Sequence, residues 1–309
     1  MRPLISVVIP LYNKAPHIYK TLNSVLAQKI QPQEIIVVDD GSNDGGDKIV
    51  ERLNNPLIKL HRQTNKGVSS ARNAGVNLAK GSHIAFLDAD DEWESNHIQI
   101  LLELIKQFPG LGAYSTIYKI QQADKIILPK SAYPVGTFHQ VDDFFSKFAI
   151  GLSLIHSSTA CIKRESLIAL GGFPEGVQRG EDIIMWIKLA RGFGMAHAAT
   201  YSAIYNRDAV NRSIHLRKTE PPGSLLYLTE LLSGNIDPIE SRSGTNLFAC
   251  IAFYTAAGMV ESRDYGGVMG ILNIVKLNKL WWLYAKIILL LPFPSCVMSY
   301  ARYWRHRLL

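Results

Sequence analysis

The chain has 309 residues, of which 47% are hydrophobic and 19% are charged. This composition excludes a disordered, collagenous or disulfide-rich protein, and the length allows two domains or one large domain with an appendage. The cysteines are three in number and far apart, which fits neither a zinc site nor a disulfide framework. We therefore expect a protein with a hydrophobic core, in a reducing compartment.

The formal net charge of +7 is concentrated at one end of the chain. Residues 265–309 contain six basic residues and no Asp or Glu, so that residues 1–264 are nearly neutral. A basic, apolar C-terminus favours an anionic membrane surface as partner over nucleic acid. The opening MRPLISVVIP is too short in its apolar part for a signal peptide, which predicts a cytosolic body at the cytoplasmic side of the cell membrane.

Short apolar strands alternate with amphipathic helices through the first third of the chain. Strands are expected at residues 4–9, 34–39, 57–61 and 82–87, and helices at 16–26, 47–53, 68–79 and 95–107. Four such units predict an α/β fold with a doubly wound, mostly parallel sheet. In these sheets ligands bind beyond the carboxyl ends of the strands.

The pattern then changes twice along the chain. Shorter strands are expected at 114–120, 125–128, 159–162 and 201–205, with a helix at 181–191. After Pro221 and Pro222 only helices are expected, at 225–232, 246–260, 267–277 and 280–291. We therefore predict a catalytic domain over 1–218 and a helical C-terminal region over 219–309, whose tail from about residue 280 associates with a membrane.

An acidic cluster follows the fourth predicted strand. Asp88, Asp90 and Asp91 repel one another, and a divalent cation would offset that repulsion. Mg²⁺ and Mn²⁺ prefer oxygen ligands and are usually held by one or two carboxylates together with substrate phosphates. The alternative is an acidic helix start, which accounts for one carboxylate better than for three.

A second acidic pair, Asp39 and Asp40, ends the second predicted strand. Carboxylates at this place contact the ribose or base in nucleotide-binding folds, although a simple turn uses the same residues. The sequence contains neither a G-x-G-x-x-G after the first two strands nor a G-x-x-x-x-G-K-[ST]. Both absences argue against a dehydrogenase and a P-loop NTPase.

Three further features suggest chemistry. Arg72 lies on a helix rich in small residues and can bridge the acidic cluster and a nucleotide, although a solvated arginine is the simpler alternative. Glu181 and Asp182 begin a helix with Trp186 on the face of Asp182, and a carboxylate there can act as a general base. A polar loop near the end of the domain is either a diphosphate-binding loop or a linker; it contains Arg207, Arg212 and His215.

The order of these motifs is more informative than any one of them. They are Ser6-Val-Val-Ile-Pro-Leu-Tyr-Asn13, Val38-Asp-Asp-Gly-Ser42, Ala71-Arg-Asn-Ala-Gly75, Phe86-Leu-Asp-Ala-Asp-Asp91, Gly171-Gly-Phe-Pro174 and Gly180-Glu-Asp-Ile-Ile-Met-Trp186. In number, order and spacing the series resembles the family 2 glycosyltransferases of GT-A fold, over about the first 215 residues.

The resemblance implies a metal-dependent, inverting transfer from a nucleotide sugar, with Mn²⁺ or Mg²⁺ as cofactor. It implies that Asp88 and Asp90 are the D-x-D, with Asp90 the preferred metal ligand and Asp91 a further candidate. Asp182 corresponds to the catalytic base and Glu181 to its neighbour. The residues expected to bind the nucleotide sugar are Pro10, Tyr12, Asn13, Asp39, Asp40, Arg72, Asp88, Asp91, Trp186, Arg207 and Arg212.

The tail from Leu280 to Ala301 contains a single charged residue, Lys286, and it has aromatic residues near both ends. An interfacial or re-entrant helix is favoured over a true span because Lys286 and two prolines interrupt the stretch. The alternative is a helix packed on the catalytic domain. A membrane-attached enzyme would use a glycan or polyprenyl-linked acceptor.

Two other functions remain open from sequence. A catalytically silent sugar-nucleotide-binding scaffold would share the fold, but Asp90 and Asp182 argue against it. A nucleotidyltransferase that makes nucleotide sugars would need a glycine-rich basic loop where Pro10 to Asn13 stand. The donor sugar and acceptor are not determined, with a UDP-sugar as the first expectation.

Overall fold

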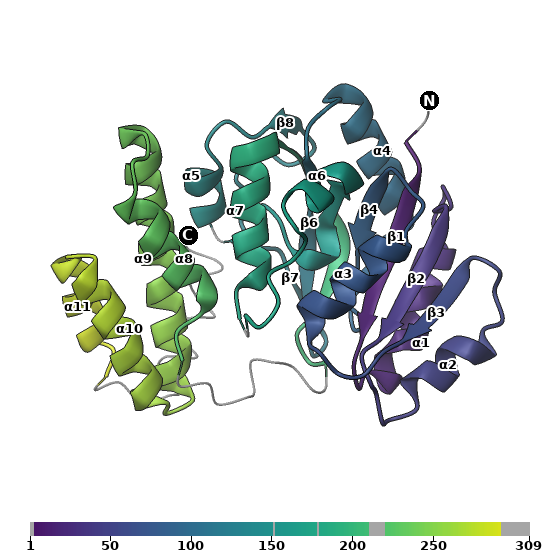
Figure 1. Cartoon of the computed structure of the whole chain (residues 1–309), viewed down its shortest axis with the longest axis horizontal. Helices are drawn as coiled ribbons and strands as arrows, with labels where there is room; N and C mark the ends of the chain where they lie inside the picture. The colour runs from purple at the N-terminus through teal and green to yellow at the C-terminus, as the bar shows by residue number, and fades with distance from the viewer. Residues whose placement is uncertain (1–2, 151, 178, 210–219, 292–309) are drawn as a thin grey trace.

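The computed structural model describes residues 3–150, 152–177, 179–209 and 220–291 (Figure 1). One ten-stranded sheet runs through the first two thirds of the chain in the order β3-β2-β1-β4-β9-β6-β10-β5, with β7 beside β6 and β8 beside β10. The strands are β1 (Ile5–Leu11), β2 (Glu34–Asp39), β3 (Ile58–Arg62), β4 (His83–Phe86), β5 (Glu92–Trp93), β6 (Ala113–Gln122), β7 (Lys125–Ile127), β8 (Phe138–Gln140), β9 (Ala160–Lys163) and β10 (Met195–Asn206).

Helices cover both faces of this sheet, and further helices pack on those helices. They are α1 (Ala15–Leu26), α2 (Gly46–Arg52), α3 (Val68–Leu78), α4 (His97–Gln107), α5 (Phe144–Ala149), the 3-10 helix η1 (Ser157–Thr159), α6 (Arg164–Ala169), α7 (Glu181–Phe193), α8 (Gly223–Ser233), α9 (Pro238–Glu261), α10 (Tyr265–Leu277) and α11 (Trp281–Ile288).

The parallel α/β prediction is confirmed in the first half of the sheet. Strand β1 pairs in parallel with β2 and β4, and β2 pairs in parallel with β3. Consecutive residues of β1 point into two different cores, since Val7 packs with the α1 and α4 side and Val8 with the α3 side. Burial on both faces is the reason why β1 and β2 are apolar through their middle, whereas the edge strand β3 is partly exposed and carries Lys59, His61 and Arg62.

The second half of the sheet contains more than the sequence predicted. Strand β9 runs antiparallel to both of its neighbours, β4 and β6. Strand β10 begins at Met195, earlier than predicted, and its pairing with β6 shifts register between His197 and Ala203. The short elements β5, β8, α5 and α6 were not predicted, because two to six residues are too few to produce a periodic pattern.

The four C-terminal helices extend the core on the α3 side of the sheet. Helix α8 packs on α7, α9 on α5, and α10 and α11 on α9 (Figure 1). Buried residues of these helices, such as Phe248 and Leu283, belong to the same hydrophobic cluster as Phe148 and Trp186. The predicted boundary after residue 218 adjoins residues 210–219, which lie outside the described residues, and it stays a prediction.

A close helix-to-strand contact positions α3. A Cβ atom added at Gly75 would overlap the fully buried side chain of Val8 on β1, whereas a Cβ at Gly192 in α7 would meet open space. Only a glycine therefore allows α3 to lie this close to β1.

We predict that Gly75→Ala destabilises the protein by about 1–3 kcal/mol, because α3 must move away from β1. The matched control, Gly192→Ala, should leave stability unchanged or raise it by up to about 1 kcal/mol, since alanine favours a helix. Urea unfolding of both variants measures the difference. Equal stabilities would contradict the close packing of α3.

Candidate active site

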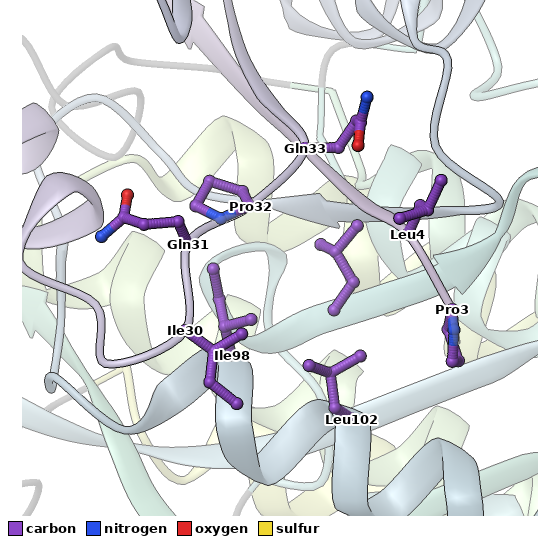
Figure 2. A pocket seen from close by; sticks show the side chains of 9 residues that line it. Pro3, Leu4, Ile30, Gln31, Pro32, Gln33, Ile98 and Leu102 are labelled. Carbon is purple, nitrogen blue, oxygen red and sulfur yellow. The ribbon is translucent and has the colours of Figure 1, made fainter. Parts of the chain in front are cut away.

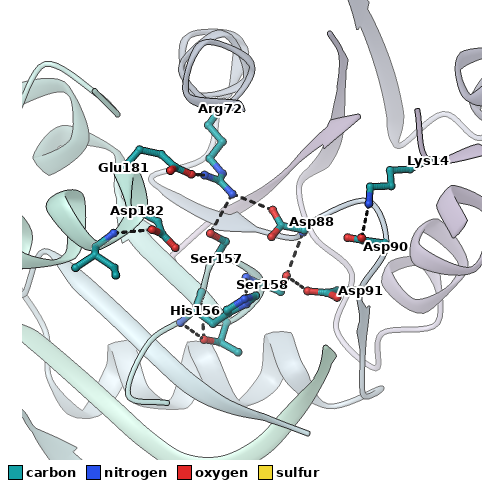
Figure 3. A network of polar contacts seen from close by, with 12 residues as sticks. Lys14, Arg72, Asp88, Asp90, Asp91, His156, Ser157, Ser158, Glu181 and Asp182 are labelled. Atoms are coloured by element: carbon teal, nitrogen blue, oxygen red, sulfur yellow. Dashed lines mark hydrogen bonds and ion pairs between the residues drawn. The ribbon is translucent and has the colours of Figure 1, made fainter. Parts of the chain in front are cut away.

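Five of the acidic residues predicted from sequence belong to one group of polar side chains (Figure 3). Asp88, Asp90 and Asp91 follow β4, and Glu181 and Asp182 begin α7. Ser157, shortly before β9, lies between Asp182 and Asp88 in the picture, with His156 and Ser158 below it. The fold thus brings together two acidic motifs that are far apart in the sequence.

Arg72 of α3 joins the two acidic groups. Its Nη2 donates to Asp88 Oδ1 at 3.0 Å and its Nη1 donates to Glu181 Oε1 at 3.1 Å. Nη2 also contacts Ser157 Oγ at 3.0 Å, and the guanidinium carbon lies 5.3 Å from the centre of the Phe173 ring. The side chain is 4% exposed, so Arg72 is a buried cation between carboxylates rather than a solvated one.

Burial and charge act on Arg72 and Glu181 in opposite directions. Burial works to lower the pKa of Arg72, but the charges of Asp88, Glu181 and Asp182 raise it above its ordinary value. Burial, followed by the charge of Asp182, raises the pKa of Glu181 to about 7 against the opposing effect of Arg72. Glu181 therefore changes between its protonated and its ionised form near neutral pH.

Asp182 lies in the first turn of α7, where the helix dipole favours negative charge. Its Oδ1 accepts a hydrogen bond from the backbone N–H of Ile183 at 2.8 Å. The side chain is partly buried, and its charge acts on both Arg72 and His156. Asp182 thus belongs to the same polar centre as the acidic cluster.

Each of the three clustered aspartates has a different partner. Asp88 binds Arg72, and Asp90 Oδ2 lies 2.7 Å from Lys14 Nζ. Asp91 is 1% exposed and accepts hydrogen bonds from the Ser158 hydroxyl and the Asn206 backbone N–H. Burial, followed by the charges of Asp90 and Asp88, raises the pKa of Asp91 well above its usual range.

His156 is a site residue that the sequence analysis missed. Its ring lies 5.0 Å from the rings of both Tyr118 and Tyr205, and its Nδ1 accepts a hydrogen bond from the backbone N–H of Ser158. Burial lowers its pKa, while the charges of Asp88 and Asp182 oppose that shift. A lone histidine before a buried strand carries no sequence signal that separates it from a core histidine.

The residues present fit a divalent cation. One ligand atom from each of Asp88, Asp91 and His156 lies within 4.8 Å of the others. Carboxylate oxygens suit Mg²⁺ and Mn²⁺, and an imidazole nitrogen adds a ligand that transition metals accept. Asp90, the ligand preferred from sequence, is not in this group because its carboxylate faces Lys14.

The residues predicted to bind the nucleotide include both exposed and buried side chains. Tyr12, two residues after Pro10, is 41% exposed, whereas Asp39 and Asp40 are at most 4% exposed. Asp40 accepts hydrogen bonds from Gln63 Nε2 and from the backbone N–H groups of Lys66 and Gly67, at 2.8 to 2.9 Å. Its carboxylate therefore holds the loop that leads into α3.

Asp39 and Asn13 hold the neighbouring turns in place. Asp39 Oδ1 accepts from the backbone N–H of Ser42, and Asn13 Oδ1 accepts from that of Asn43. The backbone N–H of Asn13 donates to Ser42 Oγ at 3.0 Å. The turns after β1 and β2 are thus tied together, and the nucleotide-binding roles of these residues stay predictions.

Trp186 does not lie where the sequence analysis expected it. It is 1% exposed, and its ring packs edge-to-face on Phe173 at 5.9 Å, inside the core. Trp186 lies one helical turn after Asp182, as the sequence analysis expected, but its side chain points into the core. Its position corrects the expectation that it binds the nucleotide sugar, because its side chain fills core volume.

The basic loop is described only in part. Arg207 Nη1 donates to Gln122 Oε1 at 3.2 Å, and its backbone N–H donates to Gln121 O. Arg212 and His215 lie outside the described residues. The diphosphate-binding role of this loop therefore stays a prediction.

A separate hollow lies at the start of β1, away from these carboxylates. Figure 2 shows it between the start of β1, the segment before β2, and α4, and none of the nine residues drawn there is charged. Ile98 and Leu102 of α4 form one wall, facing Leu4 and Pro32. This hollow has no groups for acid–base or metal chemistry.

The comparison with protein families identifies the chain. The profile described as glycosyl transferase family 2 matches residues 6–171, which is more than half of the sequence. The chain belongs to glycosyl transferase family 2. This confirms the resemblance drawn from the motifs. The matched region contains β1 to β4, Arg72 and the acidic cluster, but it ends before Glu181.

Some relatives of this chain are named for polysaccharide synthesis, and most of the relatives it matches are much longer proteins. Chondroitin synthase of Pasteurella multocida is 27% identical over 216 residues, 69% of this chain and 21% of the relative. TuaG of Bacillus subtilis, named for teichuronic acid biosynthesis, is 27% identical over 71% of this chain and 86% of its own length. A glycosyltransferase of Rickettsia conorii is 31% identical, and the match spans 30% of that protein.

Solved structures share the fold. TarS of S. aureus, residues 1–349 in complex with UDP-GlcNAc, superposes with a TM-score of 0.71 at 19% identity, over 88% of this chain and 81% of TarS. The mannosyltransferase PcManGT of Pyrobaculum calidifontis, with GDP-Man and Mn²⁺, gives 0.58 at 20% identity over 98% and 85%. The GT-A fold expected from the sequence is confirmed.

Proposed function

We propose that this chain transfers a sugar from a nucleotide-sugar donor, with UDP as the expected nucleotide, to a hydroxyl of a glycan acceptor, with inversion at the anomeric carbon. The observation that carries the proposal is the Arg72 bridge between Asp88 and Glu181. This bridge connects two groups of carboxylates. The group after β4 can hold a metal that binds the diphosphate, and the pair Glu181 and Asp182 can perform acid–base chemistry. The UDP-GlcNAc and GDP-Man of the two solved relatives support the donor class.

Asp182 acts as the general base in this proposal. Its partly buried carboxylate accepts the proton of the attacking hydroxyl, whose oxygen forms the new bond to the anomeric carbon while the nucleoside diphosphate leaves from the opposite side. A single displacement of this kind inverts configuration and needs no second nucleophile. Glu181, bound to Arg72, maintains the position of the first turn of α7.

The acidic cluster forms the donor side of the site. We assign Asp88 and Asp90 as metal ligands because the resemblance makes them the D-x-D, and Asp91 and His156 each have a possible ligand atom close to one of Asp88. A bound Mn²⁺ or Mg²⁺ supplies Lewis acidity that stabilises the charge of the leaving diphosphate. Tyr12 provides an exposed aromatic ring where the resemblance puts the nucleotide base.

We further propose a lipid-linked acceptor and a membrane-bound enzyme, acting in surface polysaccharide or glycolipid synthesis at the cytoplasmic face. The relatives named for chondroitin and teichuronic acid synthesis support the product class. Helices α10 and α11, with the residue that follows α11, support the location, because large apolar side chains there are at least half exposed. They are Tyr265, Met269, Leu277, Trp281, Trp282 and Leu289.

The charge on these helices suits an anionic membrane. Lys276, Lys279 and Lys286 are the charged residues of the described chain after Asp264, and Lys286 lies over the Trp282 ring at 5.1 Å. Helix α9 is long and apolar enough to cross a membrane by length and composition, but 61% of its apolar window is buried in the protein. An interfacial attachment therefore fits better than a span by α9, and residues 292–309 lie outside the described residues.

We predict Mn²⁺-dependent release of nucleotide from one donor in a panel of nucleotide sugars given to the purified full-length protein. Asp90→Ala should abolish the release, and Asp182→Asn should slow it by about 10²–10⁴-fold, because the base is lost while the donor side stays intact. Glu103→Gln, an exposed carboxylate of α4, is the control and should have no effect.

Direct binding of nucleotide sugars in the presence of Mn²⁺ completes this experiment. A protein that binds a donor without releasing nucleotide requires its acceptor, which is then added. Failure to bind any nucleotide sugar would contradict the proposed activity. An unchanged rate in Asp182→Asn would contradict the assignment of the base.

For the membrane proposal, we predict that the full-length protein sediments with vesicles containing phosphatidylglycerol. The double variant Trp281→Ala/Trp282→Ala should reduce partition at least about tenfold, because burial of aromatic surface contributes a few kcal/mol. The control variant Tyr19→Ala/Val135→Ala removes two comparably exposed side chains elsewhere and should bind normally. Equal partition of both variants would contradict the assignment of this face.

A further inference from the structure

Lys14 and Asp90 form an ion pair at the centre of the proposed donor site. Lys14 Nζ lies 2.7 Å from Asp90 Oδ2, and the two side chains are only 13% and 15% exposed. Lys14 immediately precedes α1, and Asp90 follows β4, so that the pair spans 76 residues of sequence (Figure 3). The carboxylate preferred as metal ligand is therefore neutralised by the protein itself.

Lys14 and Arg72 differ in the chemistry of their side chains. The Arg72 guanidinium is 4% exposed and is held by Asp88, Glu181 and Ser157. Lys14 reaches Asp90 through a flexible four-carbon stem that ends in a compact charge with three donors. Such a side chain exchanges one anionic partner for another, and lysine is a common ligand of phosphate.

An ammonium and a divalent cation compete for the same carboxylate. Lys14 holds one oxygen of Asp90, so a metal on the same carboxylate would lie close to the ammonium, and the two positive charges would repel each other in a site that is mostly shielded from water. The binding of a metal by Asp90 is therefore strengthened when Lys14 moves away. A diphosphate bound next to the metal offers Lys14 a new anionic partner, which the metal alone does not.

We propose that Lys14 occupies Asp90 in the donor-free enzyme and moves to the diphosphate when donor and metal bind together. Lys14 thereby makes metal binding weak without nucleotide and strong with it. Since coupling between two ligands is reciprocal, the metal strengthens nucleotide binding by the same factor. This inference rests on the proposed function, because it takes Asp90 as a metal ligand and a nucleoside diphosphate as the leaving group.

The structure provides a matched control on α1, the helix that follows Lys14. Lys20 of α1 pairs with Glu92 at 2.7 Å, but its side chain is 76% exposed. The loop after β4 is also held to α1 by the hydrogen bond from Thr21 Oγ1 to Ala89 O at 2.9 Å. Loss of the Lys14 charge therefore leaves an independent contact that keeps the loop in place.

The experiment measures Mn²⁺ binding to the full-length protein by electron paramagnetic resonance of free Mn²⁺, with and without saturating UDP. Wild type, Lys14→Met, Lys20→Met and Asp90→Asn are compared. We expect UDP to strengthen Mn²⁺ binding to wild type and Lys20→Met by a factor within about 5–150-fold. Lys14→Met should bind Mn²⁺ alone more tightly than wild type, by at least about fivefold, and should gain less from UDP.

Equal or weaker binding of Mn²⁺ alone by Lys14→Met, compared with wild type, would overturn the inference. The inference would also be overturned if UDP strengthened Mn²⁺ binding to Lys14→Met by the same factor as it does for wild type. Asp90→Asn separates this failure from that of the proposed function. If Asp90→Asn binds Mn²⁺ with UDP as wild type does, Asp90 is not a metal ligand, and the assignment of the metal site itself is wrong.

Discussion

The site depends on one buried cation, the guanidinium of Arg72. Its carboxylate partners, Asp88 and Glu181, lie 16 and 109 residues away in the sequence and on different elements. A buried charge is costly unless it is paired, and loss of one partner typically costs about 3–5 kcal/mol. The relative positions of the loop after β4 and of α7 are therefore coupled through α3.

The fold establishes this arrangement through packing. Gly75 lies one turn after Arg72 and allows α3 to lie against Val8 of β1, which places the guanidinium over the carboxyl end of the sheet. Phe173 packs against Arg72 on one side and Trp186 on the other. A substitution in this core would thus shift both acidic groups together, so stability and activity are linked at α3.

Local sequence patterns predicted the parallel half of the sheet, because its strands and helices are long enough to show their periodicity. They also predicted that Asp39 and Asp88 would meet at one edge, since parallel strands end on the same side. His156 and Lys14 were not found, because their importance arises from contacts with residues far away in the chain. Trp186 was misplaced because helical spacing relates two residues to each other but does not say which one faces the core.

A double-mutant cycle on Arg72 and Glu181 tests the central claim most directly. Urea unfolding is measured for Arg72→Met, Glu181→Gln, the double variant, and the exposed control Arg62→Met, whose side chain is 46% exposed. We predict that Arg72→Met lowers stability by about 3–5 kcal/mol, and by much less when Glu181 is already Gln. A loss below about 1 kcal/mol, as expected for Arg62→Met, or strictly additive losses would contradict the account.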